Sequence, residues 1–251
     1  MADRPVRVGL AGDDEAHRIL MQRLADEATT DVRDRDARRR WVRHDNDATF
    51  LQTGKRPAPE TVPSGRQPYR SQRFDGKPLG YATVFVEAAE ALHACSDIAL
   101  VLVDEDGKES RVPSAIVARE YLRRFDKAPP VVFGVCDPCA EGWLVALIGP
   151  TRPKRLAALS SSAKVKLPSQ TEHLTSHGDN TKNAKRGLHF LLDDRRKKVS
   201  DYPISTPGVD DTEPVLAASP TAPAHLKSLT GCGLASFYQQ LVDVYAPMVN
   251  G

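Results

Sequence analysis

Residues 98–107 read Ile98-Ala-Leu-Val-Leu-Val103 and then Asp104-Glu-Asp-Gly107, an unbroken aliphatic run that ends in an acidic turn. Two other segments have the same form: Val6-Arg-Val-Gly-Leu-Ala11 before Gly12-Asp-Asp-Glu15, and Val131-Val-Phe-Gly-Val135 before Cys136-Asp-Pro-Cys139. Continuous aliphatic runs bounded by turn residues are typical of strands that are covered on both faces, as in parallel sheets. The three runs therefore predict three parallel strands of one sheet.

Apolar residues at helical spacing occur between and after these runs, over 17–28, 82–94, 115–125 and 234–249. This alternation predicts an α/β fold with a mainly parallel sheet flanked by helices. We expect residues 1–150 to form the α/β domain, with a polar insertion rich in proline and glycine at about 45–80. Residues 151–251 are expected to form a mainly helical C-terminal extension packed on that domain.

The composition is that of an ordinary globular protein: 251 residues, 40% hydrophobic and 27% charged, with a net charge of +2. Nucleic-acid binding would therefore depend on local basic clusters, namely Arg38-Arg39-Arg40, Arg123-Arg124 and Arg195-Arg-Lys-Lys198. For each cluster taken singly we favour the alternative of a solvated helix face. No segment resembles a signal peptide or a membrane span of roughly 20 apolar residues, so we expect a cytoplasmic protein with no membrane contact and reduced cysteines.

Acidic residues follow the first two strands of the predicted sheet, where the functional crevice of an open α/β sheet lies. Asp13 and Asp104 should meet at one edge, and Asp106 should project to the same side as Asp104 because side chains two apart in a strand share a face. Paired carboxylates are good ligands for Mg²⁺. The alternatives are a solvated turn at 104–107 and helix capping by the acids at 13–15. His17, one helical turn further on, either ligates the ion or faces solvent, and we favour the latter.

Three other features carry possible chemistry. Glu141, ahead of the apolar run at 143–148, is either a further metal ligand or an acid in the first turn of a helix. Cys136 and Cys139 form a lone CxxC; zinc would need two more ligands, so a packed thiol pair is expected. Lys182, Lys185 and Arg186 would share one face of a helix, which could bind a phosphate backbone or simply be exposed.

The order of these motifs resembles the TOPRIM-like DUF4276 family, which is related to the TOPRIM domains of OLD-family nucleases. The resemblance covers most of the chain, with its motifs at 8–17, 99–107, 135–144, 182–188 and 231–237. It implies a TOPRIM-like domain and a Mg²⁺-dependent (or Mn²⁺-dependent) nuclease that cuts DNA or RNA. It also implies an effector role in antiphage defence beside an ATPase partner.

The same resemblance implies roles for individual residues. Asp104 and Asp106 would hold the metal, Asp13 would complete the site or act as general base, and Glu141 would support a second ion. One motif departs from the family pattern, because Asp13-Asp14 stands where Glu-Gly is expected.

Two rival interpretations remain open. A catalytically silent module that binds nucleic acid or a partner would agree with the departure at Asp13. A phospho-accepting receiver domain would use Asp13-Asp14 as its acid pair and Asp104 as its acceptor. The spacing argues against a receiver domain, because Asp104 lies 91 residues after Asp13, about twice what two βα units need at roughly 30 or more residues per βαβ unit. The insertion at 45–80 would have to absorb the excess.

Overall fold

A computed structural model of the chain describes residues 4–31, 33–41, 51–52, 73–105, 111–124, 130–162, 177–193, 198–219, 223–229 and 232–251. Its main sheet contains β1 (Val6–Gly12), β2 (Arg39–Trp41), β3 (Leu51–Gln52), β6 (Ile98–Asp104) and β7 (Val131–Cys136). A separate antiparallel pair is formed by β4 (Arg73–Phe74) and β5 (Lys77–Pro78). Most of the predicted insertion at 45–80 lies outside the described residues.

The main sheet is parallel throughout, as the aliphatic runs predict. Its order is β2-β1-β6-β7, and β3 also pairs with β1, next to Ala11 and Gly12. Leu100 is in register with Leu10 on one side and with Val132 on the other. The strand order reverses at β1, because β2 lies on one side of it and β6 on the other.

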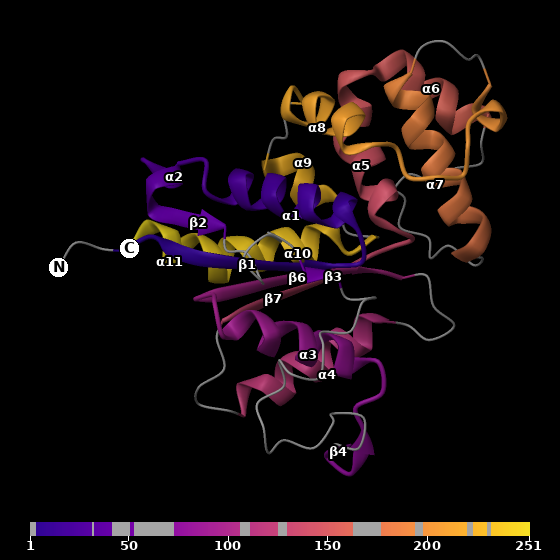
Figure 1. The fold of residues 1–251 in the computed structure, drawn as a ribbon. Helices are drawn as coiled ribbons and strands as arrows, with labels where there is room; N and C mark the ends of the chain where they lie inside the picture. The colour runs from indigo at the N-terminus through magenta and orange to yellow at the C-terminus, as the bar shows by residue number, and fades with distance from the viewer. Residues whose placement is uncertain are drawn as a thin grey trace.

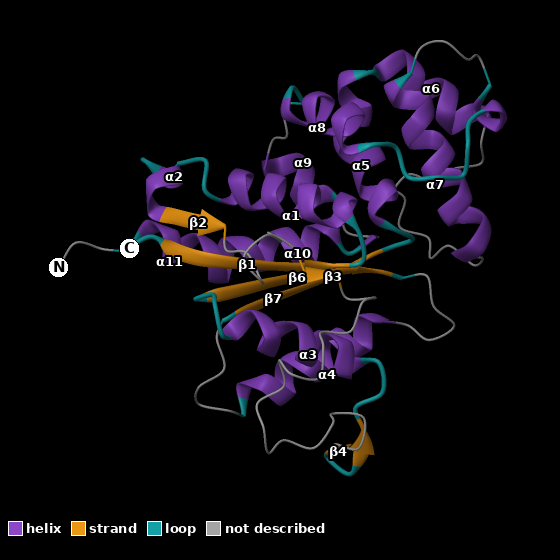
Figure 2. Cartoon of the chain, in the orientation of Figure 1, coloured by secondary structure: helices purple, strands orange, loops and turns teal. Residues whose placement is uncertain are grey.

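Helices cover both faces of this sheet (Figures 1 and 2). α1 (Glu15–Ala28) and α10 (Leu234–Gln240) lie on one face, and α3 (Ala82–His93) and α4 (Arg111–Arg123) lie on the other. Alternate strand residues divide between two hydrophobic clusters, so that Leu100 packs toward α1 while Val101 packs toward α3. This two-sided burial is why the strands have no polar alternation.

A helical C-terminal stretch is present, as predicted. It contains α6 (Pro153–Ser162), α7 (His177–Leu192), α8 (Val209–Ala217), α9 (Pro223–Ser228), α10, a π-helical turn (Leu241–Tyr245) and α11 (Ala246–Asn250). α7 packs on α5 (Ala140–Ile148) and α6, while α8 packs on α1 and α5. No helix in the described part of the chain is long and apolar enough to cross a membrane.

In the basic cluster Arg38-Arg39-Arg40, the middle residue is buried and not solvated as predicted. Arg38 and Arg40 are exposed, but Arg39 is 8% exposed, forms an ion pair with Asp26 and donates to the Tyr245 hydroxyl at 3.3 Å. The Arg39 guanidinium is therefore paired inside the protein, where it links β2 to α1 through Asp26 and to the π-helical turn through Tyr245. The interpretation as a solvated residue was therefore wrong for Arg39, because its partners Asp26 and Tyr245 come from other segments of the chain.

The residue just before α10, Gly233, packs against β7 at a position where a side chain would not fit. Gly233 has φ +83°, and a Cβ there would lie 2.5 Å from the carbonyl oxygen of Val135. The left-handed backbone and the close approach to β7 both require the absence of a side chain. Gly233 therefore allows the chain to pass close to β7 immediately before α10 begins.

We expect Gly233→Ala to lower the free energy of unfolding by more than Gly76→Ala does. Gly76 has a similar φ of +78°, but a Cβ added there would have no other atom within 4 Å, so its substitution costs only the backbone strain, about 1–2 kcal/mol. Urea unfolding of the two variants isolates the cost of the contact with Val135. Equal losses would contradict the close packing of Gly233 on β7.

Candidate metal centre

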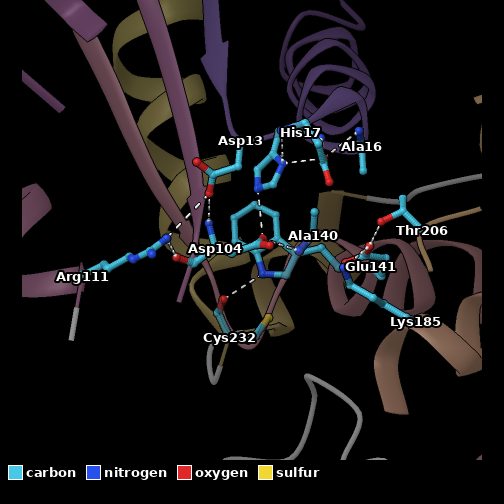
Figure 3. A network of polar contacts seen from close by, with 12 residues as sticks. Asp13, Ala16, His17, Asp104, Arg111, Ala140, Glu141, Lys185, Thr206 and Cys232 are labelled. Atoms are coloured by element: carbon cyan, nitrogen blue, oxygen red, sulfur yellow. Dashed lines mark hydrogen bonds and ion pairs between the residues drawn. The ribbon is translucent and has the colours of Figure 1, made fainter. Parts of the chain in front are cut away.

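Asp13 and Asp104 lie together at the carboxyl edge of β1 and β6, as predicted. The Asp104 backbone N–H donates to Asp13 Oδ2 at 3.1 Å. The two strands are adjacent at the point where the strand order reverses, which is where open α/β sheets bind their ligands. Figure 3 shows both acids among side chains from α1, α4, α5 and α7.

Asp104 connects three elements through one carboxylate oxygen. Its Oδ1 accepts from the backbone N–H of Ala140, the first residue of α5, at 2.7 Å, and lies 2.9 Å from His17 Nε2. Burial raises the pKa of Asp104, His17 opposes this rise, and the negative charge of Glu141 adds to it. Glu141 is therefore close enough to Asp104 to act on it electrostatically.

His17 is fully buried, which corrects the expectation that it faces solvent. Its Nδ1 lies 2.8 Å from Asp14 Oδ1, and the same carboxylate oxygen caps α1 by accepting from the backbone N–H groups of Ala16 and His17. Burial lowers the pKa of His17, but the carboxylates of Asp104 and Asp14 outweigh it and raise that pKa to about 10. The ring therefore carries its proton at neutral pH and donates to both carboxylates.

The sequence signal for His17 was the Asp-x-x-His spacing of Asp14 and His17. It corresponds to the capping-box pattern with histidine in the place of the usual Glu or Gln. A side chain that reaches back to the N-cap of α1 also points toward the strand edge, where Asp104 lies. Asp14 is accordingly a cap, one of the alternatives for the acids at 13–15.

Glu141 is an acid in the first turn of α5 and is only 1% exposed. Its Oε1 accepts from the Thr206 hydroxyl and lies 3.5 Å from Lys185 Nζ. Its buried Oε2 has no hydrogen-bond partner among the described residues. A buried carboxylate with one unsatisfied oxygen is costly, so this position is suited to a cation.

Arg111, at the start of α4, is a site residue that the sequence analysis missed. Its guanidinium donates to the Asp104 carbonyl, lies 3.6 Å from Asp13 Oδ2 and stacks 4.4 Å from the centre of the Tyr81 ring. Its backbone N–H donates to both carboxylate oxygens of buried Glu105 at 2.9 Å. No local motif marks it, because its partners come from three other segments.

The remaining predicted residues divide into two groups. Asp106 lies outside the described residues. On α7, Lys182 is exposed, Lys185 is turned to Glu141 and is 24% exposed, and Arg186 is half-buried. The predicted basic face thus supplies one lysine to the candidate site and leaves a second lysine exposed.

The CxxC cysteines are buried thiols, as expected for packed residues. Burial raises the pKa of Cys136 and of Cys139 well above the usual range. Cys136 also lies beside the site: its Sγ, a ring nitrogen of His17 and a carboxylate oxygen of Asp104 are all within 4.8 Å of one another.

Comparisons with protein-family models, with curated proteins and with solved structures gave no match for this chain.

The buried His17 should make stability fall as pH rises. Because folding raises its pKa from 6.5 to about 10, its stabilisation is complete below pH 6.5 and is lost as the pH approaches 10. In chelator-treated protein we expect the free energy of unfolding to fall by up to about 1.4 kcal/mol per pH unit between about pH 6.5 and 8.5, before unfolded-state thiols titrate. Urea titrations across this window measure the slope.

His17→Gln should flatten that slope, and Asp14→Asn should reduce it because one of the two carboxylates is lost. A slope in His17→Gln equal to that of the wild type would mean that another group binds the proton.

Proposed function

We propose that this chain is a Mg²⁺-dependent hydrolase of phosphodiester bonds in nucleic acid. The observation that carries the proposal is the convergence of Asp13, Asp104 and Glu141 at the switch point of a parallel sheet. The resemblance to TOPRIM nucleases points to the same acids. An ATPase partner and a role in antiphage defence belong to this proposal through that resemblance, and the cytoplasmic location expected from the sequence belongs to it as well.

The donor set supports a hard cation. Oδ2 of Asp104 accepts no hydrogen bond from the described residues, and neither does the buried Oε2 of Glu141. Mg²⁺ is commonly held by one or two carboxylates together with water and phosphate oxygens. Asp104 and Glu141 are therefore the proposed ligands, with Asp13 at the rim of the site and Asp106 as a further candidate.

The bound ion would activate water and neutralise charge on the scissile phosphate. Asp13, at the end of β1, is positioned to accept a proton from the attacking water. Arg111 and Lys185 provide positive charge on opposite sides of the acids, which suits a phosphodiester oxygen (Figure 3). The Tyr81 ring and the Asp104 carbonyl fix the direction of the Arg111 guanidinium.

We expect the wild-type chain to cleave DNA or RNA when Mg²⁺ or Mn²⁺ is added, and Asp104→Asn to lose this activity. The loss should be on the order of 100-fold or more, because several kcal/mol of charge stabilisation depend on the ion. Cleavage of labelled single- and double-stranded substrates is the measurement. The matched control is Glu15→Gln, which removes an exposed carboxylate from the same end of the sheet and should keep activity.

Circular dichroism should accompany this assay because Asp104 also holds α5 and His17. Asp13→Asn, at the rim of the site, provides a second variant. Undiminished cleavage in both variants would overturn the proposed site.

Lys182 should contribute to nucleic-acid affinity without sequence preference. We expect Lys182→Ala to weaken binding and to reduce the slope of log K against log salt by about 1, the release of roughly one counterion. Lys77→Ala, an exposed lysine on β5, is the control and should leave the slope unchanged. Fluorescence anisotropy at several salt concentrations decides between a phosphate contact and a solvated side chain.

One observation favours the alternative of a catalytically silent binding module. Oδ1 of Asp104 is already bonded to Ala140 and His17, and Asp13 lies against Arg111, so internal partners balance much of the acidic charge. Binding without cleavage under any divalent metal would favour this alternative, and restored cleavage in Asp13→Glu would identify the shorter acid as the cause. Labelling of Asp104 by acetyl phosphate would instead favour the receiver interpretation.

A further inference from the structure

We propose that His17, Asp104 and Cys136 form an inner site for a transition-metal ion of the zinc class. This site uses Oδ1 of Asp104, whereas the proposed Mg²⁺ site uses Oδ2. The inference goes beyond the proposed nuclease function and does not depend on it.

The three donor atoms are already close to the spacing that such an ion requires. A ring nitrogen of His17, a carboxylate oxygen of Asp104 and Cys136 Sγ lie within 4.8 Å of one another. Zinc bonds of about 2.0–2.3 Å in a tetrahedral arrangement would set these atoms roughly 3.4–3.6 Å apart. Shifts of about 1 Å are therefore enough, and they amount to opening the 2.9 Å contact between His17 Nε2 and Asp104 Oδ1 while drawing the sulfur in.

The kinds of donor select the class of ion. Imidazole nitrogen, thiolate sulfur and one carboxylate oxygen suit Zn²⁺, Co²⁺ or Fe²⁺, whereas Mg²⁺ prefers oxygen ligands alone. Three protein ligands also leave a fourth position for water or substrate, as in catalytic zinc sites. The two carboxylate oxygens of Asp104 would thus bind different ions, with Oδ1 on the transition metal and Oδ2 on Mg²⁺.

The groups behind the donors are those that support a metal. Asp14 Oδ1 lies 2.8 Å from His17 Nδ1, which fixes the ring and leaves Nε2 directed at Asp104. Metal-bound histidines characteristically donate their other ring nitrogen to a carboxylate in this way. The Ala140 N–H, which donates to Asp104 Oδ1 at 2.7 Å, orients the carboxylate ligand in the same manner.

The exchange of protons for metal is balanced. Binding would displace the thiol proton of Cys136 and the Nε2 proton of His17, so that two protons leave as one divalent ion enters. The proton on His17 Nδ1 stays in its bond to Asp14. His17 and Cys136 are fully buried and the Asp104 side chain is 14% exposed, so entry would be from the side of Asp104.

Cobalt substitution in the 251-residue chain tests the site, because a cobalt–thiolate bond has its own charge-transfer absorption in the near ultraviolet. We expect chelator-treated wild type to bind one equivalent of Co²⁺ with this absorption and to lose it when Zn²⁺ is added. Cys136→Ser should lose the thiolate band. Cys139→Ser, which removes a buried thiol from the same CxxC, is the matched control and should keep it.

Asp14→Asn should keep the band but weaken Co²⁺ binding by about 10–100-fold, since it removes the negative charge that supports His17 while asparagine can still cap α1. Absence of the band in wild type at excess Co²⁺ would overturn the inference, as would a band that persists in Cys136→Ser or disappears in Cys139→Ser. If Cys136→Ser does not fold by circular dichroism, the wild-type band and the Asp14→Asn affinity decide the question.

The same spectra separate this inference from the proposed function. Asp13→Asn should keep the cobalt band while losing Mg²⁺-dependent cleavage, because Asp13 is outside the inner site. A cobalt–thiolate band in a protein without nuclease activity would support the inner site and contradict the proposed function. Cleavage by a protein without the band would support the proposed function and contradict the inner site.

Discussion

The carboxylate of Asp104 is the interaction on which the candidate site depends. It stands at the end of the central strand β6, bonds to the first N–H of α5 and contacts the buried ring of His17 from α1. A carboxylate at a helix N-terminus satisfies an otherwise unpaired N–H and suits the positive end of the helix. Removing it would leave a buried imidazolium with one carboxylate in place of two.

This arrangement also explains the distribution of charge around the sheet edge. Asp14, His17 and Asp104 form a continuous chain of contacts, and Lys185 and Arg111 lie beside Glu141 and Asp13. Buried charges persist only when they are paired and hydrogen-bonded. Within the described part of the chain, Glu141 Oε2 has no hydrogen-bond partner and Cys136 Sγ lies close to His17 and Asp104, and each of these atoms is suited to a different class of cation.

Much of the fold could be predicted because its strands are buried on both faces. The runs that end at Ala11, Val103 and Val135 predict β1, β6 and β7 and their parallel pairing, and each strand extends one residue beyond its run. Asp13 and Asp104 could be assigned to one edge for the same reason. The short strands β2 and β3 were not predicted, because two or three residues carry no periodicity.

By itself, the sequence determined the α/β class, the parallel order of the long strands and the edge at which the acids gather. These follow from local patterns of apolar and turn residues. Only the tertiary structure decided that His17 is buried between Asp14 and Asp104, that Arg111 lies against Asp13, and that Lys185 turns to Glu141. The physical reason is that pairing of charges depends on which segments meet in space, and these partners come from strands and helices far apart in the chain.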